Sequence, residues 1–192
     1  MNTNSLHFHG FTLVLSAIVL LSGGCATTSK YSAERYKPAQ DRYGAISLHT
    51  AKKFYLCPTI DSVVPECRKL LDPSFTPWTY ATDAIEQELK VSSVNPIRPE
   101  FTFGPSFDSI KQVIAEKANK SENAVYLGTE LLWLTGSQWT IDAKLYAPTG
   151  DLLFEKRGIC IVLGVTTNDA QEVTHMAIRQ IIADPKFEQV LQ

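Results

Sequence analysis

A short apolar segment near the start of the chain, followed by a cysteine, constrains the fold most. Residues 11–21 form an eleven-residue run that contains no charged side chain. A helix needs roughly 20 apolar residues to cross the hydrocarbon core of a bilayer, so this run is too short to span it. Its length is that of the apolar part of an export signal. We therefore expect residues 1–24 to be a signal peptide and the folded domain to lie beyond Cys25.

The residues around Cys25, Leu21-Ser-Gly-Gly-Cys25-Ala, resemble the bacterial lipobox, in which small residues precede a cysteine that is lipidated and becomes the mature N-terminus. Ser22 stands where leucine is usual, and no Lys or Arg precedes the run. The resemblance implies that Cys25 is acylated. Because Ala26 replaces the Asp that retains such proteins in the inner membrane, it also implies an outer-membrane anchor facing the periplasm. Two alternatives stay open: an ordinary signal cut near Ala26, which leaves a soluble periplasmic protein, and an uncleaved anchor.

Residues 25–45 are predicted to be the lipidated N-terminus and a flexible tether, since they are polar, lack a sustained apolar period and contain Pro38 and Gly44. Residues 46–192 suffice for one periplasmic domain with a sizeable core, because 44% of the chain is apolar. The net charge of −2 comes with no basic block. Nucleic acid is therefore not an expected partner.

Beyond the tether, helical and strand periodicity alternate. The apolar spacing predicts helices over about residues 77–91, 107–118 and 170–183, and strands over about residues 52–57, 100–103, 124–134, 138–147 and 152–163. This order favours an α/β (α+β) fold. We expect a single domain in which a mixed sheet of about five strands is packed by about three helices.

Counting residues outward from the turn gives the strand pairing of the first hairpin. A turn at residues 135–137 sets Trp133 opposite Trp139 and gathers the apolar residues of both strands on one face. A slip of one residue would scatter them over both faces. The same register sets Glu130 opposite Asp142, which is a mildly unfavourable pair of like charges.

The second hairpin follows from the same count. A turn at residues 148–151 pairs Ala147 with Leu152 and brings Cys160 over Trp139 on the buried face. We therefore expect Cys160 to be a buried, unreactive thiol.

Compartment and spacing predict a disulfide between Cys57 and Cys67. Outside the reducing cytoplasm, thiols that can meet tend to be oxidised. The segment 58–66 holds two prolines and no clear periodicity, which predicts an irregular loop that the bridge would fasten to the sheet. The alternative is a domain in which all thiols are free.

Four features carry a further resemblance: Cys25, the strand Gly128–Trp133, the turn Ala147–Gly150 and the closing helix with Asp184–Phe187. With them, residues 50–192 resemble small outer-membrane lipoproteins built on an α/β domain like the N-terminal domain of TolB. The resemblance implies an assembly or accessory factor of an envelope machine, without enzymatic activity. Its implied partners are membrane lipid, through the acyl chain, and other envelope proteins; homo-oligomer formation stays open.

The search for chemistry gives no catalytic constellation. Phosphate-loop, nucleophile-elbow, zinc-pair and dinucleotide motifs do not occur. His49 and His175 are too few for a histidine-rich metal site, so no metal or cofactor is predicted. Asp83, Glu86 and Glu88 are expected on a solvated helix face. An envelope hydrolase is the weakest alternative, and it requires one of the two histidines beside a carboxylate in a cleft.

Trp133 and Trp139 are the candidate interaction residues. Exposed indole rings can stack on sugars, so these residues carry the other alternative, a glycan or peptidoglycan binding module. Tryptophan on an apolar strand face is more often part of the core. Exposure of the two rings therefore decides between a binding surface and core packing.

Overall fold

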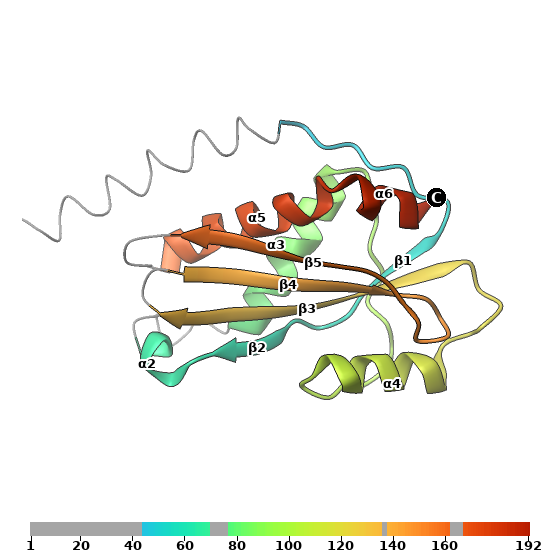
Figure 1. Ribbon diagram of the computed structural model, residues 1–192, viewed down its shortest axis with the longest axis horizontal. Coiled ribbons are helices and arrows are strands. Elements are labelled where there is room, and N and C mark those ends of the chain that lie inside the picture. The colour runs from blue at the N-terminus through green and yellow to red at the C-terminus, as the bar shows by residue number, and fades with distance from the viewer. Residues whose placement is uncertain (1–43, 70–76, 136–137, 162–166) are drawn as a thin grey trace, which may run out of the picture.

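A mixed sheet forms the centre of the domain (Figure 1). The computed structural model describes residues 44–69, 77–135, 138–161 and 167–192. The five strands are β1 (Lys53–Leu56), β2 (Ile60–Val63), β3 (Ala124–Thr135), β4 (Gln138–Tyr146) and β5 (Leu152–Ile161). Their order is β1-β3-β4-β5, with β2 also paired to β3. β1 and β2 run parallel to β3, and β3, β4 and β5 are antiparallel. The predicted fold class is confirmed.

The helices cover the two faces of the sheet unequally. The long helices are α3 (Pro77–Val91), α4 (Phe107–Lys117) and α5 (Thr167–Ile182), and the short ones are α2 (Pro65–Arg68) and α6 (Pro185–Leu191). α3, α5 and α6 supply side chains to the main core on one face, where α3 lies behind the sheet in Figure 1. α4 packs on β3 from the other face. The outward side chains of β4 and β5 beyond α4 have no covering helix in the described part of the chain.

Strand alternation separates two hydrophobic clusters. Residues at odd positions of β3, such as Leu127 and Leu131, lie in the main core with the α3 and α5 side chains. Tyr126, one position away, lies in the smaller cluster with Ile110 and Ile114 of α4. Each face of the sheet therefore has its own apolar layer, and the layer under α4 covers only part of its face.

The predicted register of the first hairpin is confirmed. Trp133 pairs with Trp139, and Glu130 pairs with Asp142. The backbone register also places residue 160 opposite Trp139, as predicted. The predicted pair of Ala147 with Leu152 is wrong by one position.

An irregularity between Leu145 and Tyr146 explains that difference. It shifts the ladder so that Tyr146 pairs with Leu152. The turn then closes through hydrogen bonds from Ala147 N to Asp151 O and from Gly150 N to Ala147 O. Gly150 has a φ of +86°, a conformation that favours glycine.

The strand predicted at residues 100–103 is wrong, and β2 is the fifth strand instead. β2 lies within the segment 58–66 that was predicted to be an irregular loop. Ile97 makes a single bridge to Tyr55 on the outer side of β1, after which the chain leaves the sheet. Helix α6, which begins at the Asp184 cap, was not predicted as a separate helix.

The predicted disulfide between Cys57 and Cys67 is also contradicted. Both thiols are free and buried. Cys57 belongs to the cluster under α4, whereas Cys67 belongs to the main core on the other face. β2 runs between the two cysteines and carries them to different layers, and burial raises the pKa of both thiols.

The export signal, Cys25 and the tether up to residue 43 lie outside the described residues, as does the side chain of Cys160. Among the helices that are described, none combines the length and the apolar character needed to cross a membrane.

The contact of α5 with β5 gives a test of the packing. A Cβ atom at Gly158 would lie 2.0 Å from the backbone oxygen of Ala177, so the helix would have to move. Gly158→Ala should therefore lower the free energy of unfolding by about 1–3 kcal/mol, measured by denaturant unfolding. Gly128→Ala is the matched control, because its Cβ would meet only side-chain atoms, with the end of Ile110 at 3.3 Å and the ring of Tyr146 at 3.5 Å. Equal stability of the two variants would contradict this packing.

Candidate functional site

A buried carboxylate joins α3 to α5. Glu88 is the one charged residue that is buried in the described part of the chain, with 5% of its surface exposed. Its Oε1 lies 2.8 Å from His175 Nδ1, and its Oε2 accepts a hydrogen bond of 2.7 Å from Arg179 Nε. The expectation that Glu88 faces solvent is wrong, although Asp83 and Glu86 do form outward ion pairs with Arg98.

The spacing on α5 explains how the cluster forms. His175 and Arg179 are four residues apart, so both side chains leave the same face of the helix, toward α3. Burial alone would raise the pKa of Glu88, but the hydrogen bonds from His175 and Arg179 outweigh it and hold the pKa below its ordinary value. The carboxylate is therefore ionised at neutral pH and paired with two donors.

A small cavity lies beside this cluster. Its volume is about 230 Å³, and its lining is Gly44, Ala45, Ile46, Glu88, Val91, Ser92 and Arg179. A histidine does lie beside a carboxylate, which is the condition set for the hydrolase alternative. His175, however, is not part of the cavity lining. Glu88, His175 and Arg179 thus form a clamp between α3 and α5, and the imidazole does not line the cavity.

A second charged cluster lies on the open part of the sheet. We call Asp142, Lys144, Glu155 and Arg157 the β4–β5 patch. Asp142 pairs with Arg157 across the two strands, and Lys144 pairs with Glu155. Arg157 donates to both carboxylate oxygens of Asp142, at 2.5 Å for Nη2 to Oδ2. Lys144 Nζ lies 3.6 Å from Glu155 Oε2 and 4.8 Å from the ring centroid of Phe107.

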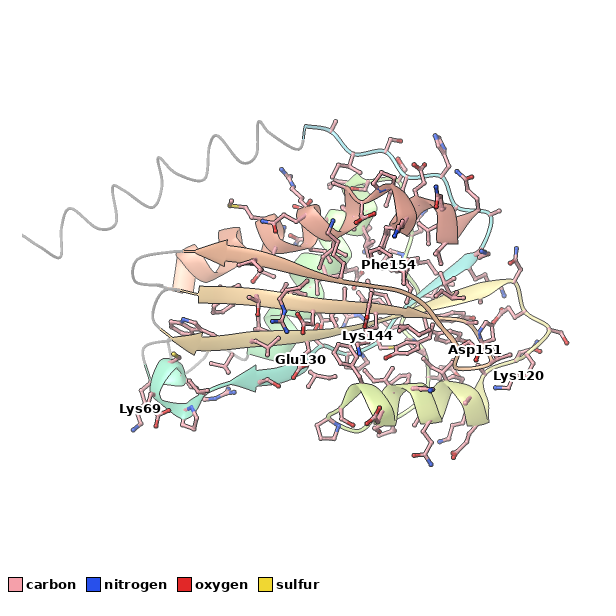
Figure 2. All side chains as sticks on the ribbon, in the orientation of Figure 1. Lys69, Lys120, Glu130, Lys144, Asp151 and Phe154 are labelled. Atoms are coloured by element: carbon pink, nitrogen blue, oxygen red, sulfur yellow. The ribbon has the colours of Figure 1, made fainter. Side chains whose placement is uncertain are left out.

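The predicted clash between Glu130 and Asp142 is relieved by neighbours on this face. Ser62 Oγ donates to Glu130 at 2.5 Å, and Arg157 binds Asp142. The hydrogen bond to Asp142 raises the pKa of the Arg157 guanidinium, to which the charge of Glu130 also contributes. Glu130 and Lys144 lie over the middle strands in Figure 2.

Apolar side chains border the patch along β5. Leu153 is 42% exposed and Ile159 is 41% exposed. Ile159 lies on the same side of the strand as Arg157 because side chains alternate, whereas the irregularity of the β4–β5 ladder interrupts this alternation at Leu153. The strands form a shallow depression of about 280 Å³ here, lined by the patch together with Ala143 and Lys156. The surface thus combines opposite charges, exposed apolar groups and a concave shape.

The predicted interaction residues Trp133 and Trp139 are both fully buried. Their ring centroids are 5.3 Å apart, and Trp139 Nε1 donates to Thr174 Oγ1 at 3.2 Å. Neither ring offers a face on which a sugar could stack, so the rings pack in the core. His49 is exposed, and its backbone N donates to Glu188.

No group of three or more His, Cys, Asp or Glu residues is arranged to hold a metal ion within the described ranges. The residues that the sequence reasoning missed are therefore Glu88 and the β4–β5 patch. The cross-strand pairs of the patch follow from the predicted register, which was a signal present in the sequence.

Comparison with known proteins identifies no family. No protein-family model matches the chain, and no curated protein shows significant similarity to it. Among solved structures, the PelC dodecamer from Paraburkholderia phytofirmans is 9% identical, with 71% of this chain and 92% of the other covered and a TM-score of 0.41. A Xanthomonas campestris protein of the family DUF330 is 11% identical, with 76% and 88% covered and a TM-score of 0.34. Likenesses at this level carry no argument about function.

The Glu88 clamp predicts a pH-dependent stability. Glu88→Gln should lower the free energy of unfolding at pH 7 by about 2 kcal/mol, because it leaves Arg179 and His175 without their anionic partner. The folded-state pKa of Glu88 is lowered from 4.5, so its stabilisation is complete above that pH and is lost as the pH falls through the lowered pKa.

Thermal unfolding of both proteins from pH 7 to pH 3 measures this effect. The gap in Tm between wild type and Glu88→Gln should narrow below pH 4.5. Glu86→Gln, at an exposed ion pair, is the control and should show a much smaller gap. A gap for Glu88→Gln that is constant with pH would contradict the clamp.

Proposed function

We propose that this chain is a lipid-anchored accessory protein of the bacterial cell envelope that acts by contact with other proteins. The observation that carries the proposal is the β4–β5 patch with its apolar border. An antiparallel sheet can face water when its outward residues are polar. Here Ile159 is exposed in line with the charges, so a partner that covers the charges also covers this apolar side chain. A non-obligate protein interface is, taken as a whole, about as apolar as the rest of the protein surface, so a surface that mixes charged and exposed apolar side chains suits such a contact.

The anchor is part of the same proposal. Acylation of Cys25 would hold the domain at the periplasmic side of the outer membrane, and the tether of residues 26–45 would let the patch reach its partner. The likeness to the N-terminal domain of TolB stays a prediction. The glycan-binding alternative loses its support, because the two tryptophans proposed to stack on sugars are buried in the core.

The anchor is tested by metabolic labelling with palmitate. Cys25→Ser should abolish incorporation of the label and move the protein to the soluble periplasmic fraction or leave it as a precursor. Cys67→Ser is the matched control and should keep the label. Ala26→Asp should keep the label and shift the protein to inner-membrane fractions in a density gradient. Labelling of Cys25→Ser at the wild-type level would exclude the lipid anchor.

The contact surface is tested by photo-cross-linking in cells. A photoreactive amino acid at Ile159 should give discrete adducts that mass spectrometry can identify. The same group at Val91, which is 71% exposed on α3, should not give these adducts. Adducts at Ile159 should also weaken when Arg157→Glu is combined with Lys144→Glu. The contact proposal would be excluded by a lack of adducts at Ile159, or by identical adducts at both positions.

A further inference from the structure

We infer that the partner of the β4–β5 patch is a second copy of this chain, packed face to face against the first. This inference rests on the proposed function, since it names the occupant of the same surface. It is carried by the order of the charges, which makes the patch complementary to itself.

The four charges of the patch form a two-by-two alternating pattern. Along β4, acidic Asp142 is followed two residues later by basic Lys144. Along β5, acidic Glu155 is followed two residues later by basic Arg157. The antiparallel register sets an acid opposite a base in both rows. Because a spacing of two residues keeps side chains on one face, all four point outward together, with a net charge of zero.

Two-fold symmetry between two copies makes this charge pattern complementary to itself. Consider two sheets that face each other about an axis that lies across the strands and passes between the two rows of the patch. Asp142 then lies over the partner's Lys144, and Glu155 lies over the partner's Arg157. The reciprocal contacts follow, because a two-fold interface uses the same surface of both copies. Every charge of the patch thus meets an opposite charge, which favours this pairing over like-charged surfaces.

Exposed apolar side chains lie at both ends of the patch along β5. Ile159 continues the outward row two residues after Arg157, and at the turn end Leu152 and Leu153 are exposed beside the irregularity of the ladder. The axis that matches the charges places Ile159 of one copy toward the turn end of the partner's β5. Apolar contacts then flank the charges at both ends, and aligned packing of two sheets about 10 Å apart leaves room for such side chains.

The ion pairs within one copy leave groups available for the partner. The side chain of Arg157 is 52% exposed and that of Glu155 is 62% exposed. Isolated pairs on a surface contribute little to stability, so little is lost when they rearrange into a network between two copies. Helix α4 packs against β3 and against the turn at Gly150, so it lies beside the patch and does not cover the four charges.

The experiment separates the charges into two full-length variants, and each variant, like the wild type, is made in two forms that carry different tags. One variant, Asp142→Lys with Glu155→Lys, makes the patch wholly basic. The other, Lys144→Glu with Arg157→Glu, makes it wholly acidic. Expressed alone, each should show self-association at least about tenfold weaker than wild type, measured by co-purification of the two tags in detergent. Expressed together, the two variants should pair at about the wild-type level or better.

Controls separate misfolding from loss of the interface. Each variant should stay folded and unfold in one cooperative thermal transition, since the substituted side chains lie on the surface. The acidic variant should have a Tm below that of wild type, because it removes Arg157 from beside Glu130 and Asp142. Glu86→Lys with Lys90→Glu exchanges an exposed ion pair on α3 and should leave self-association unchanged.

Several outcomes would overturn the inference. One is a wild-type protein whose two tagged forms do not co-purify, and another is a pair of charge-separated variants that associate no better together than apart. If the photo-cross-linker at Ile159 then captures a different envelope protein, the proposed function stands and the second copy is excluded. If it captures nothing, both fail.

Discussion

The pairing of Trp133 with Trp139 across the β3–β4 hairpin determines which side chains of the sheet face the helices. Both indoles lie in the main core, and the alternation of strand residues then forces the next positions outward. Glu130 and Asp142 are outward for this reason, and Arg157 is outward because it pairs with Asp142 across β4 and β5. A shift of one residue would turn one strand over relative to the other, which would expose one of the two tryptophans and bury the charges of that strand. The core and the charged patch are thus two consequences of one register.

The parts of the fold that could be predicted are those in which local pattern and tertiary structure agree. The three long strands show clear alternation, and a short turn fixes their pairing. β2 shows no such pattern, because Asp61 and Ser62 are polar in a strand of four residues. It is held by distant groups instead: Ser62 donates to Glu130, and Thr59 Oγ1 lies 2.9 Å from Thr129 Oγ1. No reading of residues 58–66 alone could find those partners.

The charged groups likewise divide into those that the sequence pattern predicts and those that depend on distant partners. Glu88 lies four residues after Ala84 and three after Ile85, so its spacing places it on the apolar face of α3, a signal that the expectation of a solvated face overlooked. What the sequence does not reveal is its partners, His175 and Arg179 on α5. The pairs of the β4–β5 patch, in contrast, follow from the predicted strand register. What the register does not reveal is that α4 stops short of them. The uncovered area depends on helix placement, which sequence periodicity does not determine.

The edge of β5 explains why association would involve the face of the sheet. An unpaired edge strand can add a strand from another chain, so proteins close such edges. Here Gln180 of α5 does so, since Ile159 N donates to Gln180 Oε1 at 2.9 Å and Gln180 Nε2 donates to Ile159 O at 2.8 Å. One side-chain amide thus satisfies both backbone groups of Ile159, while the side chain of Ile159 stays exposed. Closure of the edge at this residue removes backbone pairing there and leaves the side chains on the face as the groups that a partner can contact.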